Sequence, residues 1–288
     1  MYQLSNTRVE TFASAACGLY RLLIAWPDGP APKRGWPVMY LLDGERYFAT
    51  AVSLLTAMRE PRCGMTPGVI VAVDYDGPTR RDRDYRPAVE RLIPEPDPAG
   101  GLRPPGEQGD AAGFRRFLLE ELKPFIHQRY DIDSQRQALF GHSYGGLFTV
   151  DTLLEQPDSF QHFYASSPSV WWNGGYLSRQ AEAFVEHVFV EHVDAQPLNT
   201  PVSLALSVGE HEQSLEAWEQ RLPDERQRWL RQHRGQRRMV DGIRELATQL
   251  RLTTPLLTVS LHVYAEQSHM SASFPALLHA LRHHFQPS

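Results

Sequence analysis

The chain alternates between short apolar runs and longer stretches in which apolar residues recur every three or four positions. Short apolar runs are typical of buried strands, whereas the wider spacing predicts helices with one apolar face. The runs at 38–42 and 69–73 consist entirely of hydrophobic residues, which favours central strands that are buried on both faces. The predicted strands are residues 8–13, 19–26, 38–42, 69–73, 138–140, 163–166, 202–208 and 257–264.

Helical spacing fills the intervals between most of these strands. The predicted helices run from the end of the strand at 38–42 to residue 58 and over 114–130, 147–154, 176–193, 238–250 and 274–285. Behind the leading strands, strand and helix alternate strictly, which is the pattern of a doubly wound, mostly parallel sheet with an antiparallel edge strand. No repeat or linker divides the hydrophobic core, so we expect an α/β protein in which residues 1–288 form a single domain.

Two polar segments interrupt this alternation. Residues 74–110 are rich in Arg, Asp, Pro and Gly, and a loop of this length in a compact domain is usually either a functional lid or disordered. Residues 213–236 are highly charged and predict a solvated helical insertion.

The composition is that of an ordinary globular protein, with 42% hydrophobic and 22% charged residues. A net charge of -5 argues against a nucleic-acid partner, because such proteins present basic surfaces. The two cysteines provide no disulfide framework and the 12 histidines form no zinc-binding pattern, so we expect neither a metal nor another cofactor. No apolar stretch has the length of a membrane span.

Residues 1–6 lack the basic and apolar segments of a secretory signal, so we expect a cytoplasmic protein. A chain from which a leader had been removed would show the same sequence, and its location would then be the periplasm.

The most informative stretch is Gly-His-Ser-Tyr-Gly at 141–145, which lies between an apolar run and a helical pattern. A strand, a G-x-S-x-G turn and a helix make the nucleophile elbow of the α/β-hydrolase fold, in which the serine stands on a sharp turn above the sheet. Ser143 is therefore the candidate nucleophile. We expect Gly141 and Gly145 to be required, because a Cβ at either position would collide with the neighbouring strand or helix.

A serine nucleophile needs a base, usually histidine, to take its proton. In α/β-hydrolases the order along the chain is nucleophile, acid, histidine. His269 is the histidine in the loop directly after the last predicted strand, so it is the candidate base. The acid, which orients the imidazole, should follow the strand at 202–208. Three carboxylates fit, namely Glu210, Glu212 and Asp241, and the spacing from a strand-ending glycine that is common in this fold favours Glu212.

An oxyanion hole needs two backbone N–H groups directed at the developing negative charge. One is expected from Tyr144, the residue after the nucleophile. The other is expected from the loop after the strand at 38–42, where Gly44 allows a close turn, and both Gly44 and Glu45 are candidates.

Six motifs, in this order along the chain, carry a family resemblance. They are Leu-Leu-Asp-Gly at 41–44, Arg-Asp-Tyr-Arg-Pro at 83–87, Gly-His-Ser-Tyr-Gly-Gly at 141–146, Ser-Pro-Ser-Val-Trp-Trp at 167–172, Val-Gly-Glu at 208–210 and Arg-Met-Val-Asp at 238–241. Together they resemble the enterobactin-esterase-like group, the siderophore trilactone hydrolases within the esterase-D-type α/β-hydrolases. The resemblance covers nearly the whole chain, and the motif at 167–172 is its most specific element.

The resemblance implies a serine esterase in which Ser143 and His269 cleave ester bonds through an acyl-enzyme. The implied substrate is a trilactone siderophore such as enterobactin, in its ferric or its iron-free form. Members of the group are also described as using a Ser–His pair with no clear acid, so the third member stays open. The alternatives on the same fold are a thioesterase, acyltransferase or deacylase, and a non-catalytic binding protein.

A ferric catecholate is anionic and aromatic, so arginines and aromatic rings are its expected partners. The candidate substrate-binding residues are Arg80, Arg83, Trp171 and Trp172, with Arg81 and Arg86 as further cations of the polar loop. The alternative interpretation is that the arginines are simply solvated and the tryptophan pair closes a core.

Overall fold

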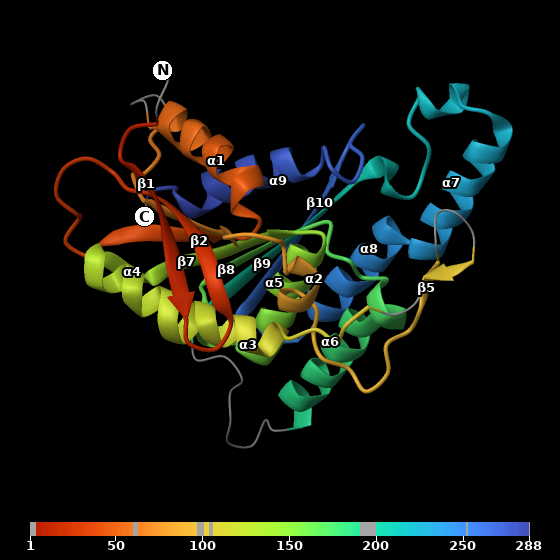
Figure 1. The fold of residues 1–288 in the computed structure, drawn as a ribbon, viewed down its shortest axis with the longest axis horizontal. Helices are drawn as coiled ribbons and strands as arrows, with labels where there is room; N and C mark the ends of the chain where they lie inside the picture. The colour runs from red at the N-terminus through yellow and green to blue at the C-terminus, as the bar shows by residue number, and fades with distance from the viewer. Residues whose placement is uncertain are drawn as a thin grey trace.

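The computed structural model describes residues 4–59, 63–96, 101–103, 106–190, 200–251 and 253–287. Its centre is an eight-stranded sheet with the order β1-β2-β4-β3-β7-β8-β9-β10 (Figure 1). Neighbouring strands from β4 to β10 pair in parallel, whereas β1 and β2 pair antiparallel at one edge. The strands are β1 (Thr7–Ser14), β2 (Gly18–Ala25), β3 (Trp36–Leu41), β4 (Val69–Tyr75), β7 (Ile132–His142), β8 (His162–Ser166), β9 (Val202–Gly209) and β10 (Leu257–Tyr264). The predicted sheet, mostly parallel with an antiparallel edge, is confirmed.

Helices cover both faces of this sheet. Figure 1 shows α1 and α9 on one face, with the helices from α3 to α6 and α8 on the other. The helices are α1 (Gly44–Met58), α2 (Arg81–Asp84), α3 (Ala111–Arg116), α4 (Lys123–Arg129), α5 (Tyr144–Glu155), α6 (Trp172–Val190), α7 (Asp224–Arg237), α8 (Met239–Arg251) and α9 (Ser273–His284). In the part of the chain that the structure describes, no helix is both long and apolar enough to cross a membrane.

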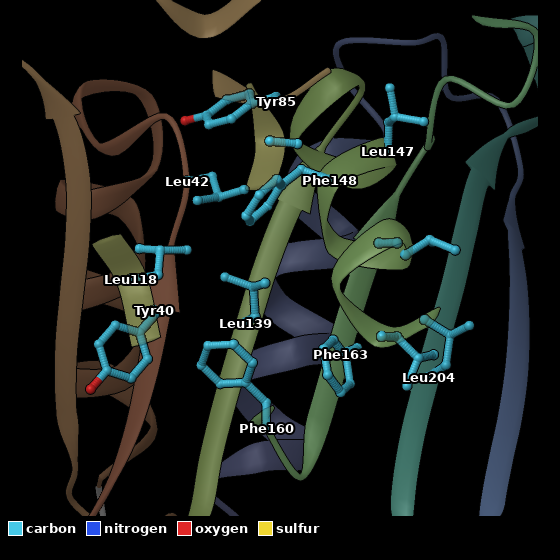
Figure 2. Close-up of a cluster of buried hydrophobic side chains, with 14 of the residues drawn as sticks. Tyr40, Leu42, Tyr85, Leu118, Leu139, Leu147, Phe148, Phe160, Phe163 and Leu204 are labelled. Carbon is cyan, nitrogen blue, oxygen red and sulfur yellow. The ribbon is translucent and has the colours of Figure 1, made fainter. Parts of the chain in front are cut away.

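Successive side chains of the central strand β3 enter different cores, because side chains alternate between the two faces of a strand. Met39 and Leu41 pack beneath α1 and α9, whereas Tyr40 belongs to the core on the other face. Figure 2 shows Tyr40 near Phe160, and their ring centroids are 5.8 Å apart. Since both faces of β3 are covered, its sequence is apolar throughout and does not alternate.

The helix predicted at 114–130 is a single helical stretch with an irregular middle. α3 begins after Asp110, whose side chain accepts a hydrogen bond from the Gly113 N–H at 3.0 Å and so satisfies a donor at the helix start. A π-helical segment, Phe117–Leu122, then joins α3 to α4. α6 covers Trp172–Val190, but Asn173, Gly174 and Gly175 have left-handed φ/ψ that interrupt it. Its regular part therefore begins at Tyr176, as predicted, and residues 191–193 lie outside the described residues.

The polar segment at 74–110 contains more regular structure than the predicted loop. Its first residues complete β4, α2 follows, and β5 (Glu95–Pro96) pairs with β6 (Leu102–Arg103) in a separate two-stranded sheet. Residues 97–100 and 104–105 of this segment lie outside the described residues. Its action as a lid stays a prediction.

The charged segment at 213–236 is helical only in its second half. α7 begins at Asp224, and Figure 1 places it at the margin of the molecule, away from the sheet. The residues before α7 include 3₁₀ turns at Glu210–Glu212 and Glu219–Arg221. The first of these turns directly follows β9, which places Glu212 at the carboxyl edge of the sheet.

Candidate active site

Ser143 stands on the sharp turn between β7 and α5, with φ 60° and ψ -117°. A positive φ is strained for a residue with a side chain, so the surrounding structure must hold it. The Ser143 N–H donates to the Ser166 carbonyl at 2.9 Å, and the Ser143 carbonyl accepts from the Leu147 N–H at 2.9 Å. The structure therefore contains the strained strand-to-helix turn that the motif predicts.

The expectation that Gly141 and Gly145 are both required is right only for Gly141. A Cβ on Gly141 would lie 2.2 Å from the Gly145 carbonyl oxygen and 2.7 Å from the Thr149 hydroxyl. A Cβ on Gly145 would come no closer than 3.5 Å to its neighbours, which is ordinary contact. The second crowded position is Gly146, where a Cβ would lie 2.9 Å from the Ser166 carbonyl oxygen.

The loop after β10 brings His269 to Ser143. Nε2 of His269 lies 3.1 Å from Oγ of Ser143, and Nδ1 lies 2.6 Å from Oε2 of Glu212. The hydroxyl, imidazole and carboxylate thus form a continuous line of hydrogen bonds. In this arrangement the imidazole can take the hydroxyl proton while the carboxylate holds the opposite ring nitrogen.

Glu212 is buried, with 4% of its surface exposed. Its Oε1 accepts from the Gly209 N–H at 2.8 Å and from the Ser167 hydroxyl at 2.5 Å. These two donors stabilise the buried negative charge, and they leave Oε2 to face His269.

The other two predicted carboxylates have different partners. Glu210 accepts from the Glu266 N–H at 2.9 Å. Asp241 accepts from the Gln213 side chain at 2.6 Å. Of the three candidates, the structure brings only Glu212 into hydrogen-bond contact with His269.

The predicted oxyanion-hole donors lie at two helix N-termini. Tyr144 begins α5 and Gly44 begins α1, and N–H groups at such ends carry partial positive charge and have no acceptor within their own helix. The Glu45 N–H donates to the Asp74 carboxylate, which favours Gly44 over Glu45 as the second donor.

Arg81 links the loop after β3 to the nucleophile turn. Its guanidinium donates to both carboxylate oxygens of Asp43, at 2.9 and 3.3 Å, and to the His142 carbonyl at 3.1 Å. From the sequence, Arg81 was predicted only to be one of several cations of the polar loop. Its position in the Arg-rich polar segment does not by itself indicate this contact.

His142, directly before Ser143, was not among the predicted site residues, although the structure places it next to His269. It is fully buried, and its ring centroid lies 4.6 Å from that of His269. Burial, with further contributions from His269 and Arg81, lowers the pKa of His142 well below its usual range. A neutral ring therefore lies beside the candidate base. Its position directly before the serine of the G-x-S-x-G motif is the feature of the sequence that could have indicated this contact.

The two predicted tryptophans have different environments. Trp171 lies beside the elbow, 6.2 Å from the Tyr144 ring, and the Arg237 guanidinium covers it at 4.0 Å. It lines an open cavity of about 420 Å³. Trp172 is only 2% exposed and packs edge-on against Tyr176. The prediction that Trp172 contacts the substrate is therefore wrong, because a ring buried in the core has no face to offer.

The contacts of Arg80 and Arg83 favour a structural role. Arg80 donates to the Leu19 carbonyl at 2.9 Å and stacks over the Tyr20 ring at 4.9 Å. Arg83 pairs with the buried carboxylate of Asp84 at 2.8 Å. Both side chains thus contact the protein itself near β2, and their role in substrate binding stays a prediction.

Arg86 is also engaged with the protein itself. Its side chain is nearly buried and donates to the carbonyls of Asp82 at 2.5 Å and Glu107 at 3.1 Å. The guanidinium also lies 5.8 Å from the Tyr144 ring centroid. Arg86 therefore connects the polar segment to the neighbourhood of the elbow.

Known proteins of similar sequence include siderophore esterases. The chain is 38% identical over 201 residues to the ferri-bacillibactin esterase BesA of Bacillus subtilis, covering 67% of this chain and 66% of that protein. It is 32% identical over 285 residues to the siderophore enterobactin esterase of Emericella nidulans, covering 94% and 91% of the two chains.

Solved structures show the same similarity. The siderophore hydrolase EstA of Aspergillus nidulans superposes with a TM-score of 0.83 at 30% identity, covering 96% of this chain and 92% of that one. Residues 18–246 also match the family model described as a putative esterase. The chain therefore belongs to this esterase family, in the enterobactin-esterase-like group of α/β-hydrolases, as its motifs predicted.

Proposed function

We propose that the chain is a serine esterase that hydrolyses the ester bonds of a siderophore trilactone through an acyl-enzyme. The observation that carries this proposal is the line of hydrogen bonds from Ser143 through His269 to Glu212. The names of the similar proteins support the substrate class, since they refer to enterobactin, bacillibactin and other siderophores.

In the first half-reaction, Oγ of Ser143 attacks the ester carbonyl while Nε2 of His269 takes the hydroxyl proton. The resulting tetrahedral intermediate carries its negative charge on the former carbonyl oxygen. The N–H groups of Tyr144 and Gly44 stabilise that charge. The imidazolium then gives its proton to the departing alkoxide, the carbon–oxygen bond breaks, and the acyl group stays on Ser143.

In the second half-reaction, a water molecule loses a proton to His269 and attacks the acyl carbon. The proton returns to Oγ of Ser143 as the acid product leaves, which restores the enzyme. Throughout both halves, Glu212 holds Nδ1–H and stabilises the imidazolium. Because its carboxylate is buried and already held by two donors, little reorganisation accompanies each proton transfer.

The surface beside the elbow fits one aromatic, anionic arm of such a substrate. Trp171 is partly exposed and carries the Arg237 guanidinium over its ring. A catecholate ring can stack on an aromatic face while its oxygens meet a cation. Trp171 is therefore the substrate-binding tryptophan in this proposal.

The test compares the parent with Ser143→Ala on a trilactone siderophore, in ferric and iron-free forms, with the linear products followed by mass. The parent should open the ring and the variant should be inactive, because no other group on the elbow can form the acyl-enzyme. Turnover of the trilactone by Ser143→Ala at the parental rate would overturn the proposed nucleophile.

Other chemistry on the same site is distinguished by the substrate. A thioesterase, acyltransferase or deacylase would also use Ser143 but would leave both trilactone forms intact and act on a thioester, acyl acceptor or amide. A non-catalytic binding protein would remain unlabelled by a fluorophosphonate, whereas the proposed esterase should be labelled at Ser143.

A further inference from the structure

The most specific sequence motif of the chain, at 167–172, contributes more than its tryptophans. Its first residues lie in the turn after β8, directly beside the nucleophile. The Ser166 carbonyl accepts from the Ser143 N–H at 2.9 Å, and the Ser169 N–H donates to the Ser143 carbonyl at 3.2 Å. Both backbone polar groups of the strained nucleophile are thus bonded to the segment 166–169.

The same segment also contacts the candidate acid. The Ser167 hydroxyl donates to Oε1 of Glu212 at 2.5 Å. Ser167 is fully buried and Glu212 is 4% exposed, so water does not compete for this bond. A buried, charge-assisted hydrogen bond is among the stronger contacts that a side chain makes. It links the segment to the carboxylate that faces His269.

The backbone of Ser167 shows why a hydroxyl at this position is informative. Its φ is 43°, a conformation that glycine adopts without strain and other residues rarely adopt. The Ser167 N–H donates to the Ser207 carbonyl at 2.7 Å, which holds the turn in place. A serine therefore occupies a position where glycine would be less strained, and only the serine has a hydroxyl to donate to Glu212.

We propose that Ser167 is a positioning residue that fixes the rotamer of Glu212. Through it, segment 166–169 holds the carboxylate of Glu212 in a fixed position relative to the turn that carries Ser143. The proposal rests on the serine-esterase mechanism given above. Glutamate has one more rotatable bond than aspartate, so its carboxylate needs more support to stay in one place. Donors from Ser167 and Gly209 hold one oxygen and direct the other at Nδ1 of His269.

The test uses Ser167→Gly and Ser167→Ala, which both lack the hydroxyl but differ in backbone strain. We expect kcat to fall by about 10- to 100-fold in both variants, by analogy with the loss of the residues that orient metal ligands. KM should change little, because no substrate contact is lost. Melting temperature should separate the two, with Ser167→Gly above Ser167→Ala, because glycine relieves the positive φ.

A purely structural role would give a different result. In that case kcat per labelled active site would fall only where the melting temperature falls. A kcat of Ser167→Gly equal to that of the parent would overturn the proposal. The pH profile of kcat/KM adds a second readout. Its acid limb should move in both variants, because loss of the Ser167 hydroxyl changes the hydrogen bonding of the Glu212–His269 pair, which a change in packing alone would not do. An unchanged profile would count against Ser167.

Two controls separate this inference from the proposed function. Ser203→Ala removes a serine hydroxyl that pairs with His162 at 2.7 Å on the neighbouring strand, and it should keep the parental kcat. Ser143→Ala tests the nucleophile itself. If Ser143→Ala abolishes turnover while Ser167→Gly retains it, only the role of Ser167 fails. If Ser143→Ala retains turnover, the esterase mechanism fails first.

Discussion

Arg81 and Asp43 form a two-point ion pair that joins the loop after β3 to the nucleophile turn. The guanidinium is 2.9 Å from one carboxylate oxygen and 3.3 Å from the other, and it also reaches the His142 carbonyl at 3.1 Å. Asp43 has φ 54° and directly precedes Gly44, the proposed second oxyanion donor. The ion pair therefore ties the loop that carries Gly44 to the turn that carries Tyr144.

Arg81→Ala should lower kcat/KM for a small activated ester by about 10- to 100-fold, because a small displacement of an oxyanion donor is costly. Arg80→Ala is the matched control, since Arg80 contacts Leu19 and Tyr20 instead. The measurement is steady-state kinetics per fluorophosphonate-labelled site. Equal losses in the two variants would show that Arg81 has no special link to the site.

Glu212→Gln should lower kcat by about 10⁴-fold, the effect of removing an orienting carboxylate from a triad. Glu210→Gln and Asp241→Asn should stay within a few-fold of the parent, because their side chains contact Glu266 and Gln213. All three variants are compared on one ester. If Glu212→Gln also remained close to the parent, the protein would work with a Ser–His pair.

Gly141→Ala should destabilise the fold or prevent folding, because its Cβ would lie 2.2 Å from a backbone oxygen. Overpacking of this kind costs about 1–3 kcal/mol or more. Gly145→Ala should keep or raise the free energy of unfolding, since its Cβ has room and alanine favours a helix by about 0.5–1 kcal/mol. Urea unfolding compares the two. Similar losses at both positions would contradict the contact analysis.

Trp171→Ala and Trp172→Ala should separate binding from stability. Trp171→Ala should raise KM for a siderophore trilactone but leave KM for a small activated ester unchanged. Trp172→Ala should lower the free energy of unfolding by about 3–5 kcal/mol, the usual cost of removing a buried tryptophan. A siderophore KM that is unaffected by Trp171→Ala would remove this residue from the binding surface.

We expect His162 to make the protein less stable in acid. Burial, with smaller contributions from His283 and Arg136, lowers the pKa of His162 to about 4, below the ordinary 6.5. The unfolded chain therefore binds the proton more readily, and the stability contributed by the neutral ring is lost as pH falls below about 6.5 and toward about 4. The slope is at most about 1.4 kcal/mol per pH unit.

His162→Asn should reduce this dependence. The measurement is urea unfolding of parent and variant at several pH values between neutrality and about 4.5. The two curves of stability against pH should diverge near neutrality and converge in acid. Parallel curves would show that other groups dominate the acid response.

The sequence alone determined the features that depend on local pattern and chain order. Apolar periodicity predicted the parallel sheet, because strand and helix periods are properties of consecutive residues. The elbow motif identified Ser143, and the order of elements identified His269. The spacing of three residues from Gly209, at the end of β9, also favoured Glu212, and the structure places Glu212 in hydrogen-bond contact with His269.

Only the tertiary structure decided between residues that share a local pattern. Trp171 and Trp172 are adjacent, yet the rotation of the chain into α6 leaves one at the site and buries the other. Arg80 and Arg81 diverge in the same way at the start of α2, with one packed against β2 and the other on the elbow.

The contact between Ser167 and Glu212 joins the loops that follow β8 and β9, two strands that pair in parallel. Distances across loops depend on strand order and register, which no single stretch of sequence contains.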